Sequence, residues 1–537
     1  MTKSKKFLLL PLIVGSALLT TLVGCGESLP KLVEGPGTGY KYGRDIFFDV
    51  NKNNQEYNYV TKKKDGQAMM PTRGKSKMLV VPVLYKGSTK TAAHMEQNRE
   101  TCRRAFFGKP EETYWHSVNS YFKQVSYGLL DIQGEVSPAV TLPQDHGYYA
   151  SKGSSSTNSI LESAYNALFK EVDGKAPLYN WEDYDSNGDG LVDSIYLVHE
   201  APLGEEFDWA FTTWHRNGFK KYPHLGAYCW SSIDFATRGI GSTANLPDGH
   251  TFIHETGHLM GLNDYYDYYN KNQSPAGGCI MQDNNICDHD PFSKYLYGWT
   301  TPTIVTDENK EDTIEIELKP FESSGDTLLL ASGFNDTSLD EYLLIEYYTP
   351  TGINKFDSEV KYEACEGLTE KGLKIWHCDK RVYESYLHEE GSGIDRTVTT
   401  YFNPNASEDP DVKGLVDKPD TDGKEYYAIF STNTSEHYGG ENFYITPELQ
   451  LLRKRTMKPG ENEMSLAVND DMWFEGETFG AKGDKFENFE FYDTIEDVDY
   501  DCTVDQWNAA AKRKLPYSLK VESLGDTAKI VLTKLAA

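Results

Sequence analysis

Two histidines, His254 and His258, enclose Glu255 in the segment HETGHLMGLND at positions 254–264. On a helix, residues four apart lie on one face, so both imidazoles can bind one metal ion. Glu255 could then reach a water molecule on that ion. Catalytic zinc takes three protein ligands and keeps a fourth position open for this water. The spacing therefore predicts a zinc site with His254 and His258 as ligands and Glu255 as general base.

The third zinc ligand must come from outside the helix. Gly261 is where we expect the helix to stop, because glycine enters the left-handed region at little cost. Asp264, three residues later, could then deliver a carboxylate to the same ion. Asp267 is also within reach of such a turn, so the spacing leaves two alternatives.

The residues around the motif predict a buried helix. An apolar face would be formed by Phe252, Ile253, Leu259, Met260 and Leu262. Four tyrosines follow the motif, at positions 265, 266, 268 and 269. We expect them to pack around the site, although one could contact substrate.

Two other segments begin like the motif but cannot form the site. His199 and His388 are each followed by glutamate. However, Leu203 and Ser392 occupy the positions where the second histidine is needed.

The extended motif resembles that of the metzincin clan of zinc metalloproteases. More closely, HETGHLMGLNDYYD is similar to the immune inhibitor A family of secreted bacterial metalloproteases. Residues 77–83 resemble the first core strand of that family, 117–128 its first helix and turn, and 290–299 the end of its catalytic domain. Met281 resembles the methionine of a Met-turn.

This resemblance covers residues 75–301 and implies an α+β fold, a metzincin-like peptidase domain with a twisted sheet and an active-site helix. It implies zinc as cofactor and a protein or peptide as substrate. It places Met281 as an apolar base beneath the ligands, and its spacing favours Asp264 over Asp267 as the third ligand.

The first 25 residues predict a lipoprotein signal peptide. Three lysines precede an apolar stretch at 7–24, and the sequence LVGC ending at Cys25 resembles a lipobox. Cleavage before Cys25 and its lipidation would anchor the chain at the membrane, since several acyl chains give lasting attachment. The alternatives are a transmembrane helix of marginal length or an ordinary cysteine. We expect a protein on the extracellular side of the bacterial membrane, lipid-anchored or released from it.

Charge and cysteine content exclude some classes. The chain has 53 basic and 82 acidic residues, a formal net charge of −29. A nucleic-acid-binding protein needs a basic stripe, and none is present.

After Cys25, seven cysteines remain, and outside the cytosol some could form disulfides. Cys279 with Cys287 and Cys365 with Cys378 are candidates, but sequence does not fix the pairing.

A second cluster predicts structural calcium. Oxygen-bearing side chains alternate along one loop, at Asp185, Asn187, Asp189 and Asp193. They occupy positions 1, 3, 5 and 9 of an EF-hand-like loop, with glycine at position 6. Tyr196 replaces the glutamate of position 12, so the site would be weak or completed from elsewhere. Residues 194–198 predict a buried strand instead of an exiting helix. The alternative is a plain turn.

The chain divides into several regions. Residues 26–72 are poor in large apolar side chains and predict a tether or pro-segment. Residues 73–301 mix helix and strand signals and form the expected catalytic domain. Residues 302–537 predict one or two β-sandwich modules, with strands at 314–318, 328–332, 342–348, 372–377, 517–523 and 528–535. A short helix is expected near 504–514.

These features predict a secreted, surface-anchored zinc metalloendopeptidase. The alternatives are an amidase acting on cell-wall peptides and a non-catalytic surface-binding lipoprotein. An intact Glu255 argues against the binding protein, which would not need a general base.

Overall fold

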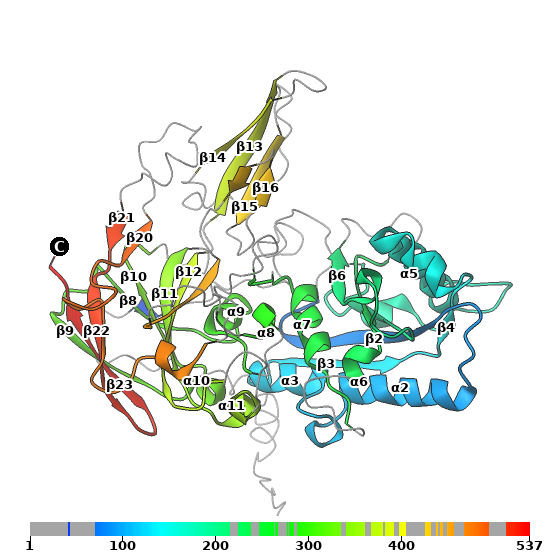
Figure 1. Cartoon of the computed structure of the whole chain (residues 1–537), viewed down its shortest axis with the longest axis horizontal. Helices are drawn as coiled ribbons and strands as arrows, with labels where there is room; N and C mark the ends of the chain where they lie inside the picture. The colour runs from blue at the N-terminus through cyan, green and yellow to red at the C-terminus, as the bar shows by residue number, and fades with distance from the viewer. Residues whose placement is uncertain are drawn as a thin grey trace, which may run out of the picture.

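The computed structural model is drawn in Figure 1. It describes residues 70–188, 190–214, 224–237, 246–262, 264–266, 277, 279–283, 287–334, 340–359, 367–379, 448–455, 467–492 and 512–536, and the backbone of six further strands. The predicted mixture of helices and sheets is confirmed, with several separate sheets in the described part.

The first sheet supports the helix that carries the candidate site. Its order is β3 (Leu130–Val136), β2 (Gly74–Leu84), β5 (Ser194–His199), β7 (Ala227–Ser232) and β6 (Phe211–Trp214), and β4 (Val140–Thr141) pairs with the end of β2. Strands β3, β2, β5 and β7 are parallel, whereas β6 is antiparallel to β7. Parallel strands are normally buried on both faces, and every residue of β5 and β7 is buried. Among the described strands, β6 ends the sheet.

Helices cover both faces of this sheet (Figure 1). Alternate side chains of a strand point to opposite faces. Met78 and Val80 of β2 accordingly join one hydrophobic cluster, and Leu79 and Val81 join another. The first cluster includes side chains of α2 (Ala92–Phe107), α3 (Val118–Val125), α6 (Asp234–Thr237) and α7 (His250–Leu259). The second includes side chains of α4 (His146–Ala150) and α5 (Thr157–Leu168).

Two sheets, built from C-terminal strands except for β1, share a third hydrophobic cluster. One has the order β1 (Lys41–Tyr42), β8 (Thr303–Thr306), β10 (Thr327–Ala331), β11 (Glu341–Tyr348), β12 (Gly372–Asp379) and β18 (Leu449–Leu452). The other has the order β19 (Thr478–Phe479), β22 (Tyr517–Leu524), β23 (Ala528–Lys534) and β9 (Thr313–Leu318). Leu343 and Ile375 of the first sheet and Ile316 and Leu532 of the second all belong to the cluster.

Short elements complete the described fold. Strands β13 (Val382–Glu390), β14 (Thr397–Asn403) and β15 (Glu425–Phe430) form one small sheet, and β16 (Glu436–Tyr438) pairs with β17 (Glu441–Phe443). Four short helices are α8 (Ile280–Asp283), α9 (Pro291–Leu296), α10 (Phe321–Ser324) and α11 (Lys355–Glu359).

The predicted C-terminal strands, one from alternating apolar residues and five from short strand-like runs, are confirmed. β9 alternates strictly between exposed and buried positions, and β10, β11, β12, β22 and β23 coincide with the other five predicted strands to within two residues at each end. The expected helix near 504–514 is wrong over its last three residues. Lys512–Lys514 form β21, which pairs with β20 (Glu490–Tyr492). Tertiary strand pairing overrides local helical propensity there; residues 504–511 lie outside the described residues.

The N-terminal predictions fall mostly outside the described residues, including the signal peptide and Cys25. Met70 and Thr72 lie within the expected tether or pro-segment, yet both are buried. The Met70 N–H donates to the Leu259 carbonyl at 3.0 Å, and the Thr72 carbonyl accepts from Trp299 Nε1 at 2.7 Å. No helix in the described ranges has both the length and the apolar character to cross a bilayer.

The disulfides considered from spacing are absent from the described cysteines. Cys279, Cys287 and Cys378 are buried thiols, and Cys365 lies outside the described residues. Burial raises the pKa of the Cys287 thiol well above its usual value. Such buried thiols are chemically inert.

Candidate metal centre

Helix α7 carries the histidine motif and is buried along its whole length. The Asp248 carboxylate accepts from the His250 N–H at 3.0 Å, which satisfies one amide that the first helical turn leaves open. After the helix, Gly261 adopts a φ of +99°. The Leu262 N–H then donates to the Gly257 carbonyl at 3.1 Å, as in a Schellman motif. The prediction that Gly261 turns the chain is confirmed.

This turn brings Asp264 back to the two histidines. Asp264 Oδ1 lies 2.9 Å from His254 Nε2 and 3.2 Å from His258 Nε2, and these nitrogens are 3.2 Å apart. All three side chains are buried. A tetrahedral zinc ion with bonds of about 2.0–2.2 Å holds neighbouring donor atoms about 3.4 Å apart. The three atoms are therefore spaced to share one small cation. Asp267 lies outside the described residues.

Both imidazoles are oriented by main-chain carbonyls. His254 Nδ1 donates to the Ile280 carbonyl at 2.7 Å, and His258 Nδ1 donates to the Leu262 carbonyl at 2.8 Å. A carbonyl oxygen can only accept, so each ring carries a proton on Nδ1. In neutral rings, both Nε2 atoms are acceptors that face each other and a carboxylate. Such buried acceptors need a positive charge beside them, either a ring proton shared with Asp264 or a bound cation, and metal-binding histidines are usually oriented in this way.

The electrostatics of the cluster favour that charge. Burial by itself lowers the pKa of His258, but the Asp264 carboxylate reverses this effect and raises the pKa to about 9. Burial likewise raises the pKa of Asp264, yet His258 and His254 hold it well below its usual value. The carboxylate therefore stays ionised at neutral pH and attracts a cation to the cluster.

Glu255 lies beside the cluster with 5% of its surface exposed. Burial raises the pKa of its carboxyl, while His258, His254 and a hydrogen bond from Thr212 partly oppose the rise. Thr212 Oγ1 donates to Glu255 Oε2 at 2.7 Å. A carboxyl with a raised pKa suits a base that must accept a proton and then release it near neutral pH.

Met281 lies against the middle of α7. A Cβ built on Gly257 would be 2.5 Å from Met281 Sδ, so this sulfur contacts the helix between the two histidines. The preceding residue, Ile280, supplies the carbonyl that holds His254. Met281 therefore packs against the helix that carries His254 and His258.

The tyrosines after the motif have different positions. Tyr265 is fully buried, its N–H donates to the Met281 carbonyl at 2.9 Å, and its hydroxyl lies 2.9 Å from Ser293 Oγ. It thus packs around the site, as expected. Tyr266 is half-buried, and the tyrosines at 268 and 269 lie outside the described residues.

The acidic loop is held by its own main chain. Asp185 accepts from the N–H groups of Gly188 and Gly190 at 2.8 and 2.9 Å. Asp193 is 2% exposed and accepts from Ser76 Oγ at 2.9 Å. Asn187 is described, whereas Asp189 is not. Residues Ser194–His199 form buried strand β5, so the predicted strand after the loop is confirmed.

Sequence reasoning missed Thr212 and the two orienting carbonyls. Thr212 lies 43 residues before Glu255 and belongs to no motif. Ile280 and Leu262 act through their main chains, so their side chains carry no signal. The one signal for the segment of Ile280 was the resemblance of the next residue, Met281, to the methionine of a Met-turn.

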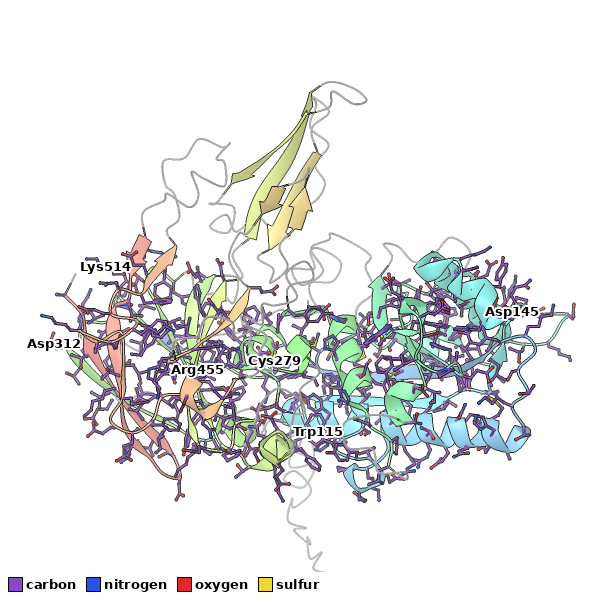
Figure 2. The ribbon with its side chains drawn as sticks, viewed as in Figure 1. Trp115, Asp145, Cys279, Asp312, Arg455 and Lys514 are labelled. Carbon is purple, nitrogen blue, oxygen red and sulfur yellow. The ribbon has the colours of Figure 1, made fainter. Side chains whose placement is uncertain are left out.

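The site lies centrally in the molecule. Figure 2 labels Cys279, which directly precedes α8, between the first sheet and the C-terminal sheets. The chain matches no protein-family model and no curated protein.

Proposed function

We propose that this chain is a zinc metalloendopeptidase that hydrolyses proteins or peptides and resembles the immune inhibitor A family. The convergence of His254, His258 and Asp264, with Glu255 beside them, carries this proposal. Both histidines donate from Nδ1 to carbonyls, so their Nε2 atoms, which face the Asp264 carboxylate, are the ring nitrogens that would bind a metal together with it. Two histidines and one carboxylate form a typical donor set for catalytic zinc.

Each residue of the site has a defined role in this proposal. Bound zinc would lower the pKa of a water molecule and polarise the scissile carbonyl. Glu255 accepts the proton of the attacking water and passes it to the leaving amine. The main-chain carbonyls of Ile280 and Leu262 keep the two imidazoles in the required tautomer.

The edge strand β6 is the proposed binding strand for substrate. Extended peptides add to exposed sheet edges through main-chain hydrogen bonds. β6 ends its sheet among the described strands, and its Thr212 contacts Glu255. A peptide paired with β6 would therefore pass close to the general base.

The finer fold assignment is part of the same proposal. A mostly parallel sheet with an antiparallel edge strand and a buried motif helix is consistent with a metzincin-like peptidase domain. The shared cluster of the two C-terminal sheets is consistent with a β-sandwich.

We also propose structural calcium in the 185–193 loop and lipid anchoring through Cys25 on the extracellular side of a bacterial membrane. The first rests on preorganised Asp185 and Asp193, and the second on the lipobox resemblance alone. Replacing Cys25 by alanine should release the protein from membranes into the medium. Continued membrane attachment of that variant would contradict lipidation.

Digestion of casein with and without a chelator tests the proposed function. Activity should disappear when metal is removed and return when zinc is added. Casein digestion that is unaffected by removal of all bound zinc would contradict the proposal. Digestion of cell-wall peptides but not casein would favour the amidase alternative.

A further inference from the structure

We propose that Thr212 is a positioning residue that holds the Glu255 carboxylate in place for proton transfer. This inference rests on the proposed function, because it assigns a role within the same reaction. It concerns a residue of β6, an element distant in sequence from the histidine motif.

The Thr212 hydroxyl has three acceptors within reach but only one proton. Oγ1 lies 2.7 Å from Glu255 Oε2, 3.0 Å from the Glu255 carbonyl and 3.2 Å from Cys229 Sγ. An ionised carboxylate is the strongest acceptor of the three, and the carboxylate contact is also the shortest. The proton therefore points at Oε2.

Cys229 supports Thr212 from the neighbouring strand. The two residues are directly opposite in the pairing of β6 with β7, so their side chains lie on the same face. Burial raises the pKa of the Cys229 thiol well above its usual value, which keeps its proton in place. The thiol proton has two acceptors within reach, Thr212 Oγ1 at 3.2 Å and the Glu255 carbonyl at 3.7 Å, and donation to either one leaves the threonine proton for Glu255 Oε2.

This chain of donors fixes one oxygen of a buried carboxylate. With Oε2 held by Thr212, Oε1 remains to accept the proton of water. The Glu255 side chain has three rotatable bonds. Without the Thr212 hydroxyl, no described donor would fix its Oε2. Misplacement of a catalytic group lowers kcat more than it weakens substrate binding.

Variants at Thr212 separate positioning from packing. Thr212→Val preserves the shape and removes the hydroxyl, whereas Thr212→Ser preserves the hydroxyl. Thr212→Ala, compared with Thr212→Ser, gives the same contrast if the valine variant does not fold. Thr72→Val is the matched control, because Thr72 Oγ1 also makes a buried hydrogen bond, to the Tyr297 carbonyl at 3.2 Å.

The zinc-loaded variants are assayed for kcat and KM on fluorogenic casein, for bound zinc and for thermal midpoint. We expect Thr212→Val to lower kcat about tenfold, an increase of roughly 1.4 kcal/mol in the barrier. KM, zinc content and midpoint should stay near wild type, and Thr212→Ser should keep most activity. In crystals of the metal-free proteins, the Glu255 carboxylate should move in the alanine variant and stay in place in the serine variant.

Several outcomes would overturn the inference. These are a kcat within twofold of wild type for Thr212→Val, an equal loss in Thr72→Val, or a loss explained by lower zinc content. An unmoved Glu255 in the alanine variant would also contradict it. Glu255→Ala is assayed in parallel. If that variant retains wild-type activity, the proposed function itself fails, which separates the two claims.

Discussion

Met281 Sδ occupies the space that a side chain at position 257 would need. A Cβ on Gly257 would lie 2.5 Å from this sulfur and 3.2 Å from Met281 Cε. Glycine inside a helix costs about 1 kcal/mol relative to alanine. The close contact with Met281 explains why position 257 is nevertheless glycine. The contact ties the helix that carries His254 and His258 to the segment whose Ile280 carbonyl orients His254.

A double-mutant cycle tests this contact. Gly257→Ala should destabilise the protein by about 1–3 kcal/mol through overpacking, and Met281→Ala by about 2–5 kcal/mol through a cavity. Because the second change creates the space that the first one fills, the double variant should lose less than the sum, by about 0.5–3 kcal/mol. Urea unfolding of the four proteins measures the coupling. Strictly additive losses would show that the two residues do not compete for space.

Asp264 should be required for zinc binding. Asp264→Ala removes one of three donor atoms. Loss of a residue that only hydrogen-bonds to a metal ligand lowers metal affinity by up to about 100-fold, so loss of the ligand itself should lower zinc affinity by at least about 100-fold. Competition with a chromophoric chelator measures this affinity. Asp267→Ala is the control and should bind zinc normally. If Asp267→Ala loses zinc while Asp264→Ala retains it, the assignment of the third ligand is wrong.

Calcium should stabilise the 185–193 loop. In zinc-loaded Glu255→Ala protein, which prevents self-digestion, added calcium should raise the thermal midpoint. Calcium at a concentration of 100 times its Kd would raise the free energy of unfolding by about 2.7 kcal/mol. Asp185→Ala should abolish the rise, whereas exposed Asp183→Ala should retain it. A midpoint that calcium leaves unchanged in the parent protein would argue for a plain turn.

His199 should make the fold sensitive to acid. Its ring is fully buried and stacked on Trp230 at 4.5 Å, and burial lowers its pKa to about 3. The unfolded chain, with a pKa near 6.5, binds more protons between these values, so stability falls as pH drops from about 6.5 toward 3. Each pKa unit corresponds to about 1.4 kcal/mol.

His199→Phe removes this titration and keeps an aromatic ring beside Trp230. Urea midpoints at pH 7.5, 6.5, 5.5 and 4.5 should therefore fall less steeply for the variant than for wild type. Differences between the two proteins isolate His199 from the other histidines. Parallel curves over the whole range would show that His199 does not contribute to the loss.

The sequence predicts the site well where chemistry depends on local spacing. His254 and His258 share a helix face and Gly261 allows the chain to turn back, so these three positions follow from helix geometry and one glycine conformation, whereas the family resemblance favoured Asp264 over Asp267. β9 was predictable for a similar reason, because it alternates strictly between exposed and buried residues, whereas β10, β11 and β12 are continuous buried runs.

The remaining features depend on contacts between distant segments. Thr212 reaches Glu255 only because β6 folds back beside β7, and no local pattern marks that pairing. Lys512–Lys514 become a strand because they pair with β20, against the local preference for a helix. Met70 and Thr72 are buried because they hydrogen-bond to Leu259 and Trp299, which come about 190 and 230 residues later in the chain.

Glu255→Ala tests whether Glu255 activates water on a metal held by His254, His258 and Asp264. Bound zinc and casein digestion should be measured on the same preparations of wild type and variant. We expect one zinc per chain in both proteins and loss of nearly all proteolysis in the variant. Wild-type proteolysis by Glu255→Ala with its zinc in place would contradict this role of Glu255.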